Sequence, residues 1–119
     1  MRLSSTPKQV AGDSAEDSAL AYLLKQGLQL RTRNFRCKVG EIDLIMSERD
    51  TLVFIEVRKR SSMRYGGAAG SVTPAKQARL IRAAHLYLAH YRAMPPCRFD
   101  VIAFEGEQMS WIKNAFSGA

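Results

Sequence analysis

The chain has 119 residues, an apolar fraction of 46% and a formal net charge of +7. This length suits one domain with one modest core, and no apolar run approaches the roughly 20 residues that span a bilayer. We therefore expect a cytoplasmic protein without a membrane segment. The basic charge favours a polyanionic partner such as nucleic acid, although it is also compatible with a basic surface that only maintains solubility.

The first helix is predicted over residues 12–27, after a flexible N-terminal tail at residues 1–11. Asp13 or Ser14 can cap its N-terminus, and Gly27 supplies the left-handed stop. We expect residues 12–119 to form a single domain, because no internal linker or repeat interrupts them.

The remaining elements follow in an order that predicts an α/β fold. Strand patterns cover residues 28–37, 41–47, 51–60 and 97–106, and a glycine-rich segment at 61–71 is expected to be a flexible loop. A second helix is predicted at 71–91, with Thr73 as its N-cap and Pro74 at its first position. Residues 108–116 are either an edge strand or a helical turn. The order α-β-β-β-α-β indicates a mixed sheet flanked by helices.

The hairpin formed by 41–47 and 51–60 carries acids inside its strands. A turn at 47–50 would place Asp43 opposite Phe54 and Glu41 opposite Glu56. Because side chains alternate along a strand, Asp43 and Glu56 would then share one face as diagonal neighbours, roughly 7–8 Å apart at the backbone.

Two carboxylates at that separation can hold one hard divalent cation. Oxygen ligands suit Mg²⁺ or Mn²⁺, which would offset the repulsion between Asp43 and Glu56. Alternatively, these acids pair with nearby arginines on a solvated face. Cys37 and Cys97 are the only cysteines and have no CxxC spacing, so zinc is not predicted, and both are expected to be reduced thiols.

Five blocks of the sequence, in this order, resemble a known family. They are AEDSALAYLLKQG, GEIDLIM, VFIEVRKR, TPAKQARL and RFDVIAF. Together they are similar to the YraN-type family of predicted bacterial endonucleases, which resembles the Holliday-junction resolvases within the PD-(D/E)xK nuclease superfamily. The resemblance runs from about residue 12 to residue 104.

The resemblance implies a restriction-endonuclease-like core and Mg²⁺-dependent hydrolysis of phosphodiester bonds in DNA, with branched or otherwise structured DNA as an expected substrate. It assigns Asp43 and Glu56 as metal ligands and Glu16 as a further active-site acid. From its position alone, Glu16 could instead only offset the dipole of the first helix.

Arg58 departs from the superfamily pattern, which usually has lysine at this position. Its positive charge can stabilise a phosphate transition state, but its pKa lies above about 12, so it cannot serve as a general base. Lys59 does not simply replace it, because in a regular strand Lys59 points to the other face.

Several further charged residues have two open interpretations each. Arg60, Lys76, Arg79 and Arg82 are candidates to contact the phosphate backbone of nucleic acid, or they form a solvated basic face. Glu41 either supports the site or only ends the strand. Arg98 and Asp100 share a strand face and are expected to form a structural ion pair, with a supporting role of Asp100 at the site left open.

The sequence thus predicts a metal-dependent DNA endonuclease with Glu16, Asp43, Glu56 and Arg58 as its catalytic group. Symmetric cutting of two strands would favour a homodimer. Two alternatives are a non-catalytic nucleic-acid-binding module that retains the fold, with Arg58 as its indicator, and an adaptor whose basic patch meets an acidic protein.

Overall fold

The computed structural model of the protein describes residues 7–60 and 67–118. The elements in chain order are α1 (Pro7–Lys25), β1 (Gln29–Cys37), β2 (Gly40–Glu48), β3 (Thr51–Arg60), α2 (Gly67–Gly70), α3 (Pro74–Leu88), β4 (Cys97–Glu105) and β5 (Gln108–Phe116). The predicted order α-β-β-β-α-β is confirmed, and β5 adds a strand where the sequence left an edge strand or a helical turn open.

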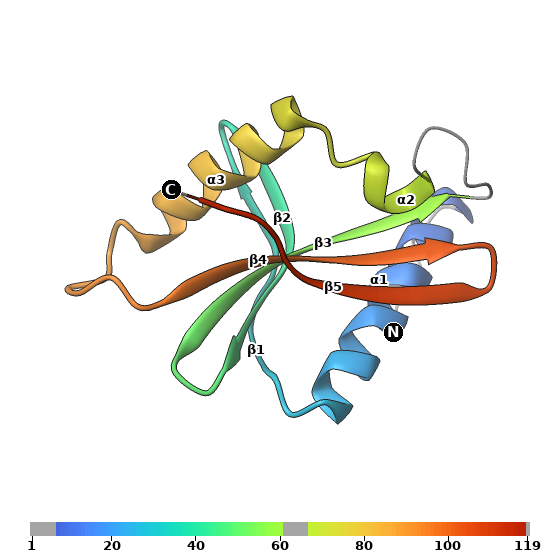
Figure 1. Ribbon diagram of the computed structural model, residues 1–119, viewed down its shortest axis with the longest axis horizontal. Coiled ribbons are helices and arrows are strands. Elements are labelled where there is room, and N and C mark those ends of the chain that lie inside the picture. The colour runs from blue at the N-terminus through green and yellow to red at the C-terminus, as the bar shows by residue number, and fades with distance from the viewer. Residues whose placement is uncertain (1–6, 61–66, 119) are drawn as a thin grey trace.

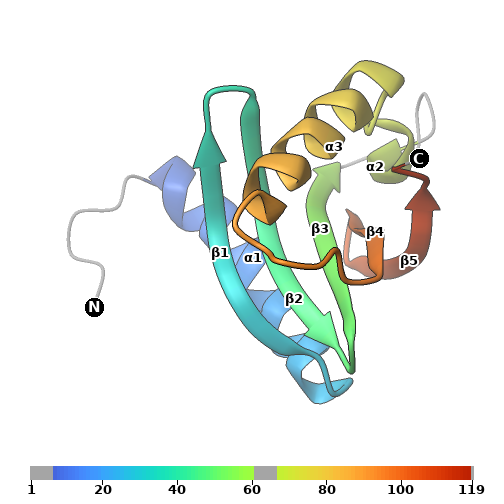
Figure 2. The ribbon, with the colours of Figure 1, turned by 90° about the vertical axis from the view of Figure 1, so that its left-hand side faces the viewer.

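The strands form one mixed sheet in the order β1-β2-β3-β4-β5. Strands β3 and β4 are parallel, whereas the other neighbouring pairs are antiparallel. Helix α1 covers one face of the sheet, and α3 with the short α2 covers the other (Figures 1 and 2). The structure therefore confirms the predicted α/β class and the restriction-endonuclease-like arrangement of a mixed sheet flanked by helices.

Two apolar clusters fill the spaces between these layers. On one face, Phe54 and Phe99 of the sheet pack with Leu80 of α3. On the other face, Ile55 of the sheet packs with Leu23 of α1. Both faces of the sheet therefore carry core, and each such side chain stabilises the fold by about 1.5–3 kcal/mol when it is fully buried. A polar group buried between these layers needs a specific hydrogen-bonding or charged partner.

Helix α1 begins earlier than its capping pattern predicted. It starts at Pro7, not at Asp13 or Ser14. Proline suits the first helical position, because its missing N–H has no intrahelical partner there. Residues 7–11 of the predicted tail thus lie in the helix, and residues 1–6 lie outside the described residues.

The predicted stop of α1 at Gly27 is confirmed. Gly27 has a φ of +96°, and the N–H of Leu28 donates to the carbonyl of Leu23 at 3.1 Å. This hydrogen-bond pattern is a Schellman motif, which ends the helix and turns the chain into β1.

The register of the β2–β3 hairpin differs by two residues from the prediction. Glu48 pairs with Thr51, so the turn consists of two residues, and Ile45 instead of Asp43 lies opposite Phe54. Arg49 supplies the positive φ, +56°, that such a short turn needs. The predicted pairing of Glu41 with Glu56 was equally wrong, since the register that pairs Leu44 with Ile55 brings Asp43, not Glu41, toward Glu56.

Helix α3 starts as predicted. Thr73 is its N-cap, Pro74 is its first residue, and the Thr73 hydroxyl accepts a hydrogen bond from the backbone N–H of Lys76 at 3.3 Å. Of the predicted flexible loop, residues 61–66 lie outside the described residues and 67–70 form α2.

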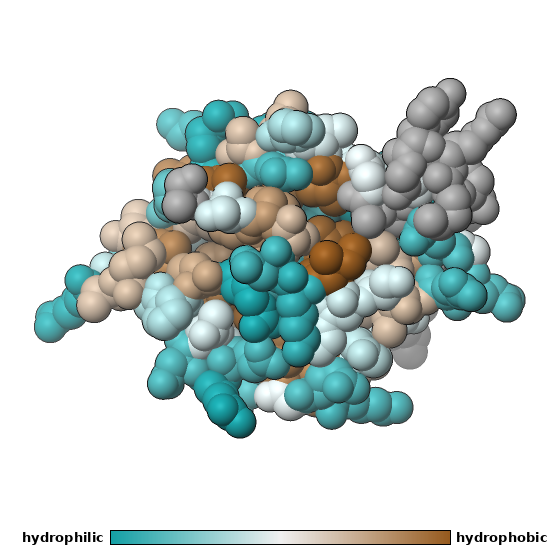
Figure 3. Space-filling view, in the orientation of Figure 1, coloured by the Kyte–Doolittle hydropathy of each residue, from teal (hydrophilic) through white to brown (hydrophobic). Residues whose placement is uncertain are grey.

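The outer surface over β5 is mixed in character. Hydrophilic residues occupy the rim and the centre of the face in Figure 3, with smaller hydrophobic patches between them. Among the described residues, no helix has the length and apolar character needed to cross a membrane.

Candidate active site

A pocket of about 290 Å³ lies where four elements meet. Helices α1 and α3 and strands β2 and β3 supply its lining: Ala15, Glu16, Glu41, Asp43, Glu56, Val57, Arg58, Lys59 and Lys76. The last backbone pair between β2 and β3 is Leu44 with Ile55. Asp43 and Glu56 are the next residues beyond this pair, each on its own strand. The pocket thus opens beyond the last paired residues of the two strands.

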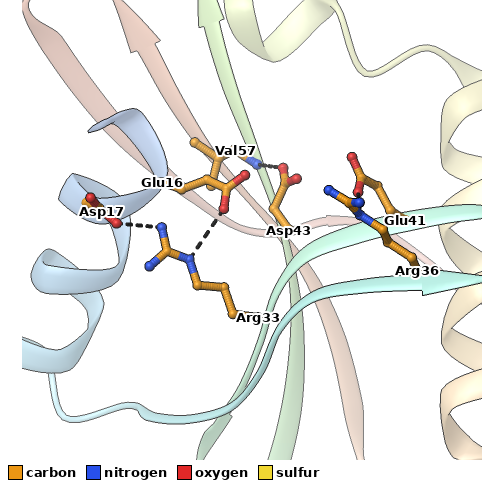
Figure 4. A network of polar contacts seen from close by, with 7 residues as sticks. All are labelled: Glu16, Asp17, Arg33, Arg36, Glu41, Asp43 and Val57. Carbon is orange, nitrogen blue, oxygen red and sulfur yellow. Dashed lines mark hydrogen bonds and ion pairs between the residues drawn. The ribbon is translucent and has the colours of Figure 1, made fainter. Parts of the chain in front are cut away.

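Asp43 spans the gap between the strands with its side chain. Its Oδ2 accepts a hydrogen bond from the backbone N–H of Val57 at 2.8 Å (Figure 4). The carboxylate thus takes the place of a main-chain carbonyl as partner of β3. This contact fixes the direction of the Asp43 side chain and holds it inside the pocket.

Asp43 lies close enough to Glu56 for that acid to affect the protonation of Asp43. Burial, the charge of Glu56, a hydrogen bond with Glu56 and the charge of Glu16 together raise the pKa of Asp43 to about 8, and the N–H of Val57 offsets only part of this rise. Negative charge is therefore disfavoured at Asp43 unless a cation comes close.

Glu56 is 4% exposed and has two cationic partners. Its Oε2 lies 3.2 Å from Nη1 of Arg58 and 3.1 Å from Nζ of Lys76. Arg58 is also fixed by a 2.8 Å hydrogen bond from its Nε to the hydroxyl of Ser71, which lies just before α3. These contacts connect Glu56 and Arg58 of β3 to the start of α3.

Glu16 enters the pocket from α1. Its side chain is 18% exposed, and its Oε1 lies 3.4 Å from Nε of Arg33 on β1. The same guanidinium also binds Asp17, so Arg33 fixes this turn of α1 against the sheet (Figure 4). The structure therefore brings Glu16 into the same pocket as Asp43.

Glu41 lies at the other end of the group of acids. It pairs with Arg36 at 3.0 Å, and both side chains are exposed. In Figure 4 the two lie beyond Asp43, on the side away from α1. Glu41 thus contributes charge to the rim of the pocket.

The predicted nucleic-acid-binding residues fall into two groups. Arg60, Arg79 and Arg82 are exposed, and Arg60 donates a hydrogen bond to the carbonyl of Lys59 at 2.7 Å. Lys76, in contrast, points to Glu56 inside the pocket. The sequence reasoning missed this ion pair, although one signal existed: a cation in the first turn of a helix is locally unfavourable and calls for a compensating acid.

The donor set fits a hard divalent cation in part. Among the described residues, no group of three or more His, Cys, Asp or Glu side chains is arranged to hold a metal. However, Mg²⁺ is usually bound through one or two carboxylates and several waters, and Asp43 with Glu56 offers such a pair. The raised pKa of Asp43 shows that a further positive charge beside it would be stabilising.

These features define an α/β protein whose central strands diverge around an acidic pocket flanked by cations. The family is shown by sequence: the chain belongs to the uncharacterised protein family UPF0102, whose model matches residues 15–104. That range includes every residue that lines the pocket.

Relatives with high identity cover nearly the whole chain. The UPF0102 protein HEAR0176 of Herminiimonas arsenicoxydans is 61% identical over 110 residues, which are 92% of this chain and 89% of the relative. A UPF0102 protein of Janthinobacterium sp. (strain Marseille) has the same identity and covers 92% of this chain. The UPF0102 protein NE0719 of Nitrosomonas europaea is 55% identical and covers 88% of this chain and 92% of its own length.

Proposed function

We propose that the protein is a metal-dependent endonuclease that hydrolyses phosphodiester bonds in DNA, with branched or otherwise structured DNA as its substrate. The observation that carries the proposal is the convergence of Asp43, Glu56 and Glu16 in one pocket with Arg58 and Lys76 beside them. The resemblance of the sequence blocks to resolvase-like nucleases supports the same chemistry.

Each residue of the pocket has a distinct task in this proposal. Asp43 and Glu56 would hold Mg²⁺ or Mn²⁺, and Glu16 would orient the attacking water or support the ion. A bound divalent ion would polarise a phosphate oxygen and make the attacking water more acidic. Arg58, held by Ser71 and Glu56, faces the negative charge that builds up on the phosphate.

The reaction is balanced without a further reactant. The oxygen of water forms a bond to phosphorus, one ester P–O bond breaks, and the proton lost by the water ends on the leaving alcohol. Arg58 is not the proton carrier, because a guanidinium stays protonated. The proton therefore passes through a carboxylate, a phosphate oxygen or solvent.

Cleavage of plasmid and four-way-junction DNA in Mg²⁺ or Mn²⁺ tests the proposal. Asp43→Asn and Glu56→Gln should each lower the cleavage rate about a hundredfold or more, because each removes charge from the reaction centre. Glu107→Gln, an exposed site in the β4–β5 turn, is the matched control and should cleave like the parent. Full activity in both pocket variants would refute the proposal.

Arg58 favours one alternative function, a nucleic-acid-binding module without turnover. The superfamily usually has lysine there, and in this protein Arg58 and Lys76 already neutralise the charge of Glu56. Such a module would retard DNA in a gel at low salt and leave it uncut at every divalent-ion concentration. Ion-dependent cleavage that is lost in Asp43→Asn would exclude it.

A further inference from the structure

Two cationic side chains of the pocket contact Glu56. The guanidinium of Arg58 and the ammonium of Lys76 both contact the same oxygen, Oε2, at 3.2 Å and 3.1 Å. The neighbouring Asp43 receives a backbone N–H from Val57 instead. The cations are thus concentrated on one of the two carboxylates that the proposed metal site would use.

Arg58 and Lys76 differ in the number of their partners and in their exposure. Arg58 has a second partner in Ser71, and its side chain is 18% exposed. Lys76 reaches Glu56 with a flexible four-carbon stem, and its side chain is 32% exposed. Ordering a long lysine side chain costs conformational entropy, and Lys76 is the more exposed of the two, so Lys76 is the cation that is displaced more readily.

The backbone position of Lys76 adds to this difference. Its N–H is bound by the Thr73 hydroxyl in the first turn of α3, where no acidic residue balances the helix dipole. A cation at this end of a helix is disfavoured, whereas an anion is favoured. The ammonium is therefore held there by Glu56, across the pocket, rather than by its own helix.

We propose that Lys76 is a built-in counter-ion of Glu56 that a divalent cation displaces. The inference rests on the proposed function, because it requires a divalent cation between Asp43 and Glu56. The displaced ammonium stays at the start of α3, where it can bind a phosphate oxygen of DNA. The same side chain thus neutralises the pocket before the ion binds and serves the substrate afterwards.

Competition for Glu56 predicts that removal of Lys76 tightens ion binding. Mn²⁺ alone is the probe, and its free concentration is followed by electron paramagnetic resonance. The salt concentration is about 0.15 M, where the Debye length is roughly 8 Å and distant exposed charges are largely screened. Lys76→Met should lower the Kd for Mn²⁺ about three- to tenfold, since a partly buried ion pair no longer opposes the ion. Lys76→Gln should act in the same direction.

Lys25→Met is the matched control, because it removes the same charge from an exposed site at the end of α1. It should change the Kd less than twofold. Equal affinities in Lys76→Met and Lys25→Met, or weaker binding in Lys76→Met, would overturn the counter-ion role.

Glu56→Gln separates this failure from failure of the proposed function. Mn²⁺ binding that is lost in Glu56→Gln but not tightened in Lys76→Met refutes only the counter-ion role. Binding that is the same in Glu56→Gln as in the parent protein refutes both the metal site and the displacement of Lys76.

Discussion

Among single residues, Asp43 combines a structural and a chemical task. It accepts the N–H of Val57 where the β2–β3 ladder ends, and it lies against Glu56 in the pocket. Its pKa is raised to about 8, chiefly by burial and by the charge of Glu56. The folded protein therefore binds a proton at Asp43 that the unfolded chain has already released above about pH 4.

This raised pKa predicts that stability falls as the pH rises between about 4 and 8 in the absence of divalent ions. Asp43→Asn removes the ionisation and keeps an oxygen for the Val57 N–H. The difference in free energy of unfolding, variant minus parent protein, should therefore increase by about 1–3 kcal/mol as the pH rises from about 5 to about 8.5. Urea unfolding with a chelator present measures it.

Asp50→Asn, in the exposed β2–β3 turn, is the control for this pH dependence. Its difference from the parent protein should stay nearly constant with pH. A constant difference for Asp43→Asn as well would mean that Asp43 is ionised throughout this range, contrary to the crowding of carboxylates in the pocket.

Among the elements, β5 is attached to β4 by backbone pairing and by one buried acid of β4. Asp100 is 1% exposed and accepts hydrogen bonds from Arg98, from Nε1 of Trp111 and from the backbone N–H of Asn114. The predicted ion pair of Arg98 and Asp100 is confirmed. Since Asp100 does not line the pocket, these contacts are structural: they satisfy the irregular part of the β4–β5 ladder.

Asp100→Ala should therefore be severely destabilising. It removes the acceptor of Nε and Nη2 of the largely buried Arg98 guanidinium, of Nε1 of Trp111 and of the Asn114 N–H, which costs about 3–5 kcal/mol. Glu48→Ala is a control on the same guanidinium, since Glu48 binds Arg98 from a more exposed position. It should cost about 1 kcal/mol or less. Chemical unfolding compares the two, and equal losses would contradict the structural role of Asp100.

For the whole molecule, which has a net charge of +7, the cations of β3 and α3 that were considered for the site fall into two groups. Lys76 and Arg58 are paired within the pocket, whereas Arg60, Arg79 and Arg82 are exposed on β3 and α3. Exposed cations release counter-ions from DNA when they contact phosphates. Among the predicted nucleic-acid-binding residues, these three exposed arginines are therefore the ones expected to make DNA affinity dependent on salt.

Replacing Arg79 and Arg82 together by Gln should weaken DNA binding and lower the slope of log K against log salt by about 2. Fluorescence anisotropy with a labelled four-way junction at several salt concentrations measures the slope. Lys25→Gln, on α1, is the control and should leave the slope unchanged. An unchanged slope in the double variant would place the DNA on another surface.

Local patterns in the sequence were sufficient for most of the fold. The alternation of apolar residues predicted the central strands, and Gly27, Thr73 and Pro74 marked helix ends that the structure confirms. These signals act within a few residues, so they are legible without tertiary contacts. The start of α1 was missed, because Asp13 and Ser14 form a plausible cap within a longer helix.

The sequence alone determined which acids were candidates for the site, because strand alternation and the family resemblance both selected Asp43 and Glu56. Only the tertiary structure decided how they meet: a two-residue turn shifted the register, and the end of the β2–β3 pairing opened the pocket. The structure alone also brought Lys76 to Glu56, 20 residues earlier in the chain. Such a contact depends on how α3 packs on the sheet, and no local pattern encodes that packing.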